Sequence, residues 1–245
     1  MIRLISAGTT HVGLLRTNNE DAYLDKPEVG LFALSDGMGG AAAGEIASRY
    51  FIETAQAVFH NRVSLSERID DALVQEVFKC SNKRIIEHTV KYPDDEGMGC
   101  TADLLAFYGR SYVIGHVGDS RVYLVRDGHL QQLTRDHSLV QGLVDEGILT
   151  PEQARHHPRK NIILRAVGTD PLVSPDILKG DALNHDIFLL CSDGLTDMLD
   201  DATIQDTLVS TKPLNDKAEN LIGAALAAGG KDNVTVVLCE VEIKD

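Results

Sequence analysis

The chain has 245 residues, of which 43% are hydrophobic and 5% aromatic, with no Trp and a formal net charge of −14. This length and apolar share suffice for one large domain with a mainly aliphatic core, whereas the excess of carboxylates argues against nucleic acid or an anionic membrane surface as a partner. Four widely spaced cysteines, which we interpret as free thiols, together with the lack of a leader pattern or of an apolar run near the roughly 20 residues that span a bilayer, predict a cytoplasmic protein.

Eight segments have the alternating or continuous apolar pattern of β-strands. They are residues 4–9, 29–35, 101–108, 111–117, 121–126, 129–133, 186–191 and 234–241. Asp127-Gly128 is a favoured hairpin turn, and Gly109-Arg110 plays a similar role one hairpin earlier. The four strands in the middle of the chain are therefore predicted to form an antiparallel meander.

Five segments have the apolar periodicity of amphipathic helices, at about residues 44–59, 69–90, 138–146, 202–210 and 217–228. Thr150-Pro151-Glu152-Gln153 has the form of a capping box with Pro at the first helical position. Early and late helices around a body of strands indicate an α+β fold, with layered strands inside and helices outside. No repeat or linker divides the chain, so we expect a single domain over residues 1–245.

Residues 136–170, called the flap below, differ in character from the rest of the chain. They are polar and carry three histidines and two prolines, which are His137, His156, His157, Pro151 and Pro158. Two interpretations remain open at this point. The flap is either a mobile insert beside a site or a surface excursion built from short capped helices.

Four aspartates, Asp36, Asp119, Asp193 and Asp232, lie at the ends of apolar strand segments, and most have glycine beside them. An unpaired carboxylate at the end of a core strand is costly, and glycine lets the backbone turn so that carbonyl oxygens approach the same point. Carboxylate and carbonyl oxygens suit Mg²⁺ or Mn²⁺ rather than zinc. One such Asp is usually a turn former or helix cap, but four repeats of the pattern favour a metal centre.

Arg16 lies in the polar stretch that leads to Glu20 and Asp21. A guanidinium amid acids suits bidentate binding of a phosphoryl group. The alternative is an exposed arginine in an ordinary loop, and this is the interpretation that Arg16 taken alone favours.

Five motifs in a fixed order carry a resemblance to a known family. They are Arg16-Thr17-Asn18-Asn19-Glu20-Asp21, Ser35-Asp36-Gly37-Met38-Gly39-Gly40, Gly118-Asp119-Ser120-Arg121, Ser192-Asp193-Gly194 and Asp232-Asn233-Val234-Thr235. In this order they resemble the motifs of the protein phosphatase 2C family, which comprises metal-dependent protein serine/threonine phosphatases. The stretches 133–138, 157–161 and 165–168 look like the flap of its bacterial members, and the likeness runs from about residue 5 to 241.

The resemblance implies a central antiparallel β-sandwich flanked by helix pairs, in α-β-β-α layers, with a metal centre at one end. By this resemblance Asp36 bridges two Mn²⁺ or Mg²⁺ ions, the Gly37 carbonyl helps to hold the second, and Asp193 and Asp232 complete the first. Asp119, with Asp193, would hold a third and weaker ion. Arg16 would bind the substrate phosphate. Supporting roles, directly or through coordinated water, fall to Glu20, Asp21 and Asn233.

The implied activity is hydrolysis of phosphoserine and phosphothreonine in proteins by a metal-activated water, with no nucleophilic Ser or Cys. The resemblance also implies signal transduction in a bacterium, with phosphorylated proteins as substrates and a serine/threonine kinase as the opposing enzyme. We expect a monomer, because nothing in the sequence indicates a dimer interface. In some family members His follows the Asp-Gly pair, whereas this chain has Met38, so the proton donor is unassigned between a metal-bound water and a histidine such as His137.

Three other functions compete with this interpretation. The first is a phosphatase of the same chemistry that acts on a small phosphorylated metabolite. The second is a binding module that has lost its metals, although all of the motif aspartates are present. The third is a structural acidic domain, which would leave the ordered motifs unexplained.

Overall fold

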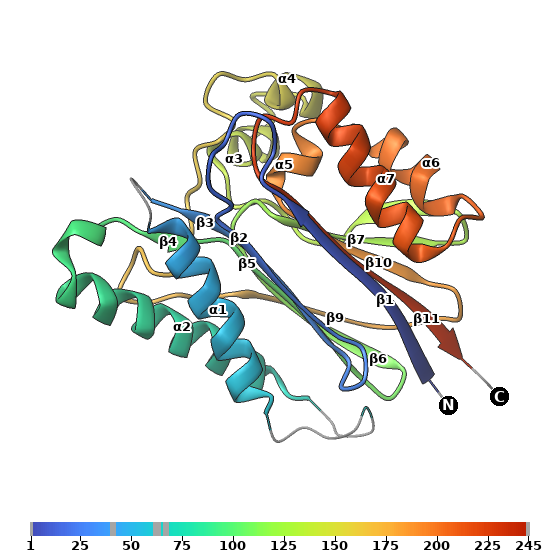
Figure 1. Cartoon of the computed structure of the whole chain (residues 1–245), viewed down its shortest axis with the longest axis horizontal. Coiled ribbons are helices and arrows are strands. Elements are labelled where there is room, and N and C mark those ends of the chain that lie inside the picture. Colours follow the sequence, from blue (N-terminus) through green and yellow to red (C-terminus); the bar gives the residue numbers. More distant parts are fainter. Residues whose placement is uncertain (1, 40–42, 61–64, 66–68, 244–245) are drawn as a thin grey trace.

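The computed structural model describes residues 2–39, 43–60, 65 and 69–243. Two antiparallel sheets lie face to face in the middle of the molecule (Figure 1). The five-stranded sheet has the order β1-β11-β10-β7-β8, with the bounds β1 Ile2–His11, β11 Val234–Ile243, β10 Ile187–Cys191, β7 Arg121–Arg126 and β8 His129–Gln132. The six-stranded sheet has the order β2-β3-β5-β6-β9, with β2 Asp21–Lys26, β3 Leu31–Met38, β5 Ala102–Tyr108, β6 Ser111–Val117 and β9 Asp176–Asp181, and the short β4 Gly99–Cys100 pairs with β3.

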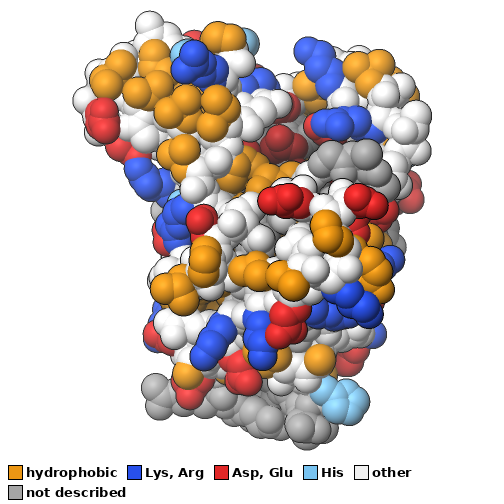
Figure 2. All heavy atoms as spheres, turned by 90° about the vertical axis from the view of Figure 1, so that its left-hand side faces the viewer, with side chains coloured by type: hydrophobic (Ala, Val, Ile, Leu, Met, Phe, Trp, Pro, Cys, Tyr) orange, Lys and Arg blue, Asp and Glu red, His pale blue; other side chains and the backbone are white. Residues whose placement is uncertain are grey.

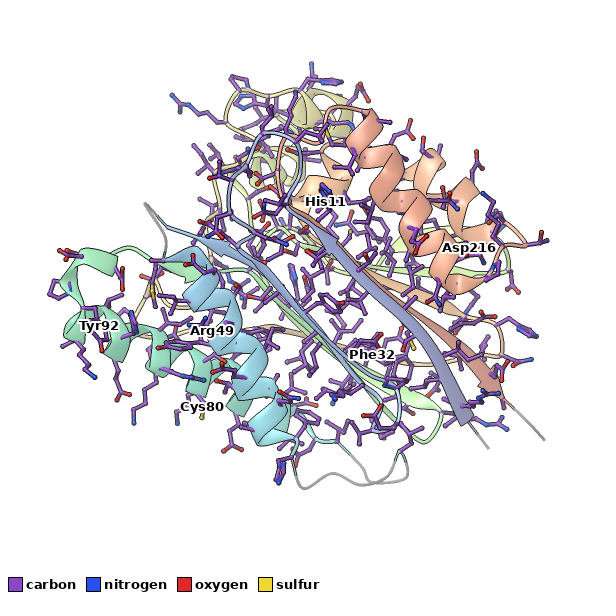
Figure 3. The ribbon with its side chains drawn as sticks, in the orientation of Figure 1. His11, Phe32, Arg49, Cys80, Tyr92 and Asp216 are labelled. Carbon is purple, nitrogen blue, oxygen red and sulfur yellow. The ribbon has the colours of Figure 1, made fainter. Side chains whose placement is uncertain are left out.

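Apolar side chains from both sheets meet in the space between them. Phe107 of the six-stranded sheet and Phe188 of the five-stranded sheet lie edge to face, with ring centroids 5.3 Å apart, and Phe32 lies in the same inner layer (Figure 3). Such aromatic contacts add to the free energy gained from burying the apolar surface. The cluster explains why β5 and β10 have almost no polar alternation, since both of their faces are covered.

Each sheet carries a helix pair on its outer face. The first pair, α1 Gly44–Val58 and α2 Asp71–Lys91, packs on the six-stranded sheet through residues such as Phe51 and Phe78. The second pair, α6 Asp201–Val209 and α7 Leu214–Ala227, packs on the five-stranded sheet through residues such as Leu208 and Leu221. The predicted α-β-β-α layers are confirmed. Among the described helices, none combines the length and the apolar character that crossing a membrane requires.

The predicted mid-chain meander is wrong. β5 and β6 form a hairpin in one sheet, and β7 and β8 form a hairpin in the other. The free edge of β6 pairs with β9, and that of β7 with β10. The chain changes sheets at Gly118, whose φ of +118° is open to glycine but disfavoured for other residues. Both two-residue turns were predicted correctly, and at the second Asp127 and Gly128 have φ values of +53° and +80°.

Three strands were not predicted. β2 and β9 have charged residues at both ends and lie at the edges of the six-stranded sheet, where most of their residues are only partly buried. β4 has only two residues, too few for any periodicity. β3 runs to Met38, so Asp36 lies inside a strand rather than after one.

The flap contains two short capped helices, α3 Leu139–Asp145 and α4 Pro151–Arg155. Ser138 caps the first, and the predicted capping box at Thr150 is present in full. Isolated strand pairing between Ser138 and Ile163 closes the base of the flap. The capped helices belong to the second of the two interpretations, but the flap also borders the acidic pocket described next.

Candidate metal centre and the adjoining groove

The four motif aspartates come from four different elements. Asp36 lies in β3, Asp119 in the crossover between β6 and β7, Asp193 at the first turn of α5 Asp193–Thr196, and Asp232 in the loop before β11. All four line one pocket of about 470 Å³, together with Gly37, Arg16, Glu20 and Asn233. Figure 2 shows a hollow near its upper edge with acidic side chains inside it. Asp21 does not line the pocket and lies beneath it.

Asp36 and Asp193 each have other carboxylates close by. Burial, and then the carboxylates of Asp21 and Asp193, raises the pKa of Asp36 well above its ordinary value. Burial, and then the carboxylates of Asp119 and Asp197, does the same to the pKa of Asp193. Carboxylates so close together repel one another, and a bound cation would relieve that repulsion.

Asp119 is 8% exposed, and its Oδ1 is buried without a hydrogen-bond partner among the described residues. Burial, and then the carboxylate of Asp136, raises its pKa to about 7. A buried carboxylate oxygen without a donor is unusual. It is the kind of ligand that a divalent cation satisfies.

Arg16 and Asp232 form an ion pair, with Nη2 donating to Oδ2 at 2.7 Å. The other oxygen of Asp232 accepts from the backbone N–H of Asn233 at 2.8 Å. The sequence assigned one residue to phosphate and the other to metal, and the structure places them in direct contact. The rest of the Arg16 guanidinium still has N–H groups for a phosphate, because an arginine carries five.

Asn233 holds the loop that carries Arg16. Its side-chain amide donates to the carbonyls of Val12 and Asn18, both at 2.9 Å, and its Oδ1 accepts from the backbone N–H of Glu20 at 2.8 Å. Burial, and then Glu45, raises the pKa of Glu20. Asn233 therefore fixes both ends of the Arg16 loop against β11, and this is how it can support the site.

Beneath the pocket, Asp21 is held by two hydroxyls that belong to the sequence motifs but were given no role. Ser192 and Thr235 donate to its Oδ2 at 2.8 Å and 2.6 Å. Burial raises the pKa of Asp21 to about 6, and these two hydrogen bonds offset part of that effect. The place of these two residues in the motifs around Asp193 and Asp232 was the available signal, but their partner lies 171 or more positions away in the chain.

Divalent cations fit this donor set in chemical type. Every candidate ligand is an oxygen, the acids repel one another, and two carboxylate oxygens, Asp21 Oδ1 and Asp119 Oδ1, are buried without partners. Across residues 2–39, 43–60, 65 and 69–243, no three Asp, Glu, His or Cys side chains already form a group with metal-ligand spacing. The fit therefore rests on donor chemistry and on the unpaired oxygens.

A larger groove of about 880 Å³ opens beside the pocket, between the flap and α5–α6. The two cavities share Asp119, Asn161 and Asp193. Two contacts join the walls of the groove: Lys160 Nζ lies 2.5 Å from Asp197 Oδ1, and Arg155 donates to the Leu199 carbonyl at 2.6 Å. Asn161 was part of a flap motif but was not predicted as a site residue.

His137, one of two proposed proton donors, lines neither cavity. Its Nδ1 accepts from the Gly118 N–H at 3.0 Å, and its Nε2 lies 3.2 Å from Asp176. Burial, and then the neighbouring His116, lowers its pKa to about 4. The side chain therefore supports the crossover turn and does not face the pocket.

A helix-flanked β-sandwich with an oxygen-rich acidic pocket at one end defines a class of metal-dependent enzymes. The sequence profile of the family described as Protein phosphatase 2C matches residues 8–228. The chain belongs to this family, as its motifs predicted.

Relatives with known names are similar over nearly the whole chain. Serine/threonine protein phosphatase PstP of Mycobacterium tuberculosis is 42% identical over 231 residues, 94% of this chain and 43% of that protein. Serine/threonine phosphatase stp of Listeria welshimeri is 38% identical, covering 94% of this chain and 93% of its own length. The chain therefore spans less than half of PstP but most of the Listeria protein.

Solved structures give the same result for the fold. The crystal structure of M. tuberculosis PstP superposes with a TM-score of 0.91 at 40% identity, over 98% of this chain and 100% of that one. A second structure, the PstP catalytic domain in complex with two manganese ions, has a TM-score of 0.90 at 39% identity, over 99% and 100%.

Proposed function

We propose that this chain is a metal-dependent hydrolase of phosphoserine and phosphothreonine in proteins. The observation that carries the proposal is the meeting of Asp36, Asp119, Asp193 and Asp232 with Arg16 in one pocket. The similarity to a PstP domain that holds two manganese ions supports Mn²⁺ or Mg²⁺ as the cofactor. One catalytic domain that works as a monomer in the cytoplasm is part of the same proposal.

The residues divide the work as follows. Asp36, the Gly37 carbonyl, Asp193 and Asp232 would hold two ions, and Asp119 with Asp193 a third, weaker one. Bound ions of this kind supply Lewis acidity, a lowered water pKa and neutralisation of phosphate charge. Arg16 keeps one N–H on Asp232 and directs others to the phosphate, so that the substrate is oriented against the acids. Asn233 keeps that arginine in place.

The groove favours a protein over a small metabolite as the substrate. It is contiguous with the pocket through Asp119, Asn161 and Asp193, so a phosphorylated residue in the pocket would have room for flanking chain beside it. A metabolite phosphatase needs no such extension. Substrates of this class are made by serine/threonine kinases, which we propose as the opposing enzymes in signalling.

The decisive experiment is hydrolysis of a phosphothreonine peptide by metal-stripped protein, with and without added Mn²⁺, beside p-nitrophenyl phosphate. We expect turnover only with metal, and a higher kcat/KM for the peptide. Asp36→Asn should abolish it, because the variant loses the central carboxylate. The matched control is Asp216→Asn, on the solvent side of α7 (Figure 3), which should behave as wild type. Full activity of Asp36→Asn would refute the metal assignment, and hydrolysis of the small ester alone would favour a metabolite.

A further inference from the structure

One buried threonine contacts the chain on both sides of the pocket. Thr101 lies between β4 and β5 and is 1% exposed. It stands opposite Asp36, because Leu34 pairs with Asp103 and Gly37 pairs with Cys100. No motif or pattern in the sequence pointed to it.

The hydrogen bonds between Thr101 and Asp36 differ from those of a regular antiparallel strand pair. Opposite residues in an antiparallel hydrogen-bonded pair exchange two N–H···O=C bonds. Thr101 N–H does donate to the Asp36 carbonyl at 2.8 Å. In the other direction Asp36 N–H donates to the Thr101 hydroxyl at 2.9 Å, and the Thr101 carbonyl instead accepts from the Ser35 hydroxyl at 2.7 Å. The hydroxyl thus takes the place of its own carbonyl and holds the backbone of Asp36.

The same hydroxyl reaches the crossover turn between the two sheets. Thr101 Oγ1 lies 2.6 Å from Ser120 Oγ, and both groups are fully buried or nearly so. On the other side of Asp119, Gly118 packs so closely that an added Cβ would lie 2.6 Å from the Thr101 Cβ. Thr101 therefore touches both neighbours of Asp119 while it is bonded to Asp36.

The turn is also fixed from the flap side. His137 donates its backbone N–H to the Gly118 carbonyl at 2.7 Å and accepts the Gly118 N–H at Nδ1. With Gly118 fixed by His137 and Ser120 fixed by Thr101, Asp119 has little freedom to move away from Asp36. This restraint matters because Asp119 and Asp36 repel each other electrostatically.

We infer that the Thr101 hydroxyl is a positioning group that sets the separation of Asp36 and Asp119, and so joins the acid of β3 and the acid of the crossover turn into one cation site. The kinetic part of this inference rests on the proposed function, whereas the geometric part does not. Thr101 touches neither substrate nor the reacting atoms, and it acts through the backbone of Asp36 and through Ser120.

Thr101→Val tests the inference, since it keeps the shape of the side chain and removes the hydroxyl. Mn²⁺ binding, measured by calorimetric titration, should weaken by about 10-fold or more at one ion, the range expected when a group that orients a ligand is lost. The kcat should fall by a similar factor while KM for p-nitrophenyl phosphate stays within about twofold. Thr101→Ser, which keeps the hydroxyl, should restore both to near wild type.

The matched control is Thr54→Val, which removes a buried hydroxyl with a 2.7 Å hydrogen bond inside α1, away from the pocket. This variant should change the melting temperature only, and its Mn²⁺ affinity should equal that of wild type. A folded Thr101→Val protein with wild-type Mn²⁺ affinity and wild-type kcat would overturn the inference. If Thr101→Val does not fold, Ser120→Ala tests the inference instead. It removes only the hydrogen bond between Thr101 and the turn that carries Asp119, and it should weaken the binding of one Mn²⁺ ion.

A metal-free crystal structure of the variant separates this inference from the proposed function. A changed separation between the Asp36 and Asp119 carboxylates supports the positioning role even if no phosphoester is hydrolysed. An unchanged separation contradicts it even if wild type proves to be an active phosphatase.

Discussion

The contact between Arg16 and Asp232 joins two residues that the sequence assigned to different tasks. Their side chains are 55% and 31% exposed, and an ion pair so accessible to water contributes about 0–1 kcal/mol to stability. The value of the pair lies in orientation. It aims the guanidinium at the pocket, on a loop that Asn233 fixes.

For this reason Arg16→Ala should act on substrate binding rather than on folding. We expect KM for phosphorylated substrates to rise by about 10- to 100-fold, in line with the loss of a charge-assisted hydrogen bond worth about 1.5–3 kcal/mol, with kcat within a few-fold of wild type. Steady-state kinetics and a melting curve measure the two effects. A large loss of melting temperature, or a fall in kcat at constant KM, would contradict the phosphate role.

A second prediction for a single residue concerns His137 and the loss of stability at acidic pH. Its folded pKa of about 4 lies below the ordinary histidine value of 6.5, and Asp176, Arg165 and His116 face its ring. Between these two values the unfolded chain binds a proton that folded His137 does not, so the free energy of unfolding falls as pH drops through this window.

Urea unfolding at pH 7 and pH 5 compares wild type with His137→Asn, which keeps an acceptor near the Gly118 N–H and does not titrate. The variant should lose less stability between the two pH values than wild type does. An equal loss in both proteins would show that another group dominates.

At the scale of elements, the N-terminus of α1 packs directly on the end of β3. A Cβ added to Gly37 would lie 2.1 Å from the Gly44 carbonyl oxygen and 2.7 Å from that of Glu20. Backbone atoms cannot give way as the end of a side chain can. The glycine after Asp36 is therefore required by packing, whatever its carbonyl binds.

Gly37→Ala should accordingly lower the free energy of unfolding by about 3 kcal/mol, the upper range for overpacking, and should do so in metal-free protein. Gly142→Ala is the control, because no atom lies within 4 Å of its added Cβ on α3, and alanine is the better helix former. Denaturant titration of both variants gives the comparison. Wild-type stability for Gly37→Ala would show that β3 and α1 can separate without cost.

The same elements show how far the sequence leads. Strands with continuous apolar runs, and helices with capping residues, were predicted to within a few positions, because their signals are local. The sequence did not predict correctly to which sheet each hairpin belongs, since nothing local at Gly118 distinguishes a turn within a sheet from a crossover between sheets.

The candidate site divides in the same way. The aspartates stand out because a carboxylate at a strand end needs a reason. Ser192, Thr235 and Asn161 belong to motifs but received no role, because a hydroxyl or an amide is ordinary in any loop or strand. Their importance comes from partners that only the folded chain brings near.

At the scale of the whole molecule, the pocket draws on both sheets, so a bound cation would hold them together. Metal that binds only the folded state should stabilise it by about 2.7 kcal/mol at 100 times the dissociation constant. We expect the melting temperature to rise with Mn²⁺ and to return when the ion is chelated. Asp36→Asn should lose most of the rise. If added Mn²⁺ does not change the melting temperature of wild type, the metal centre is refuted.

The pairing of β1 with β11 places Ile2 opposite Ile243. The five-stranded sheet is thus complete only after its last strand has left the ribosome, and contacts so distant in the chain form slowly. Asp193 and Asp232 depend on that sheet, whereas Asp36 belongs to the other. A half-made chain consequently carries acids but no assembled pocket, so the activity proposed here would begin only when translation has passed β11.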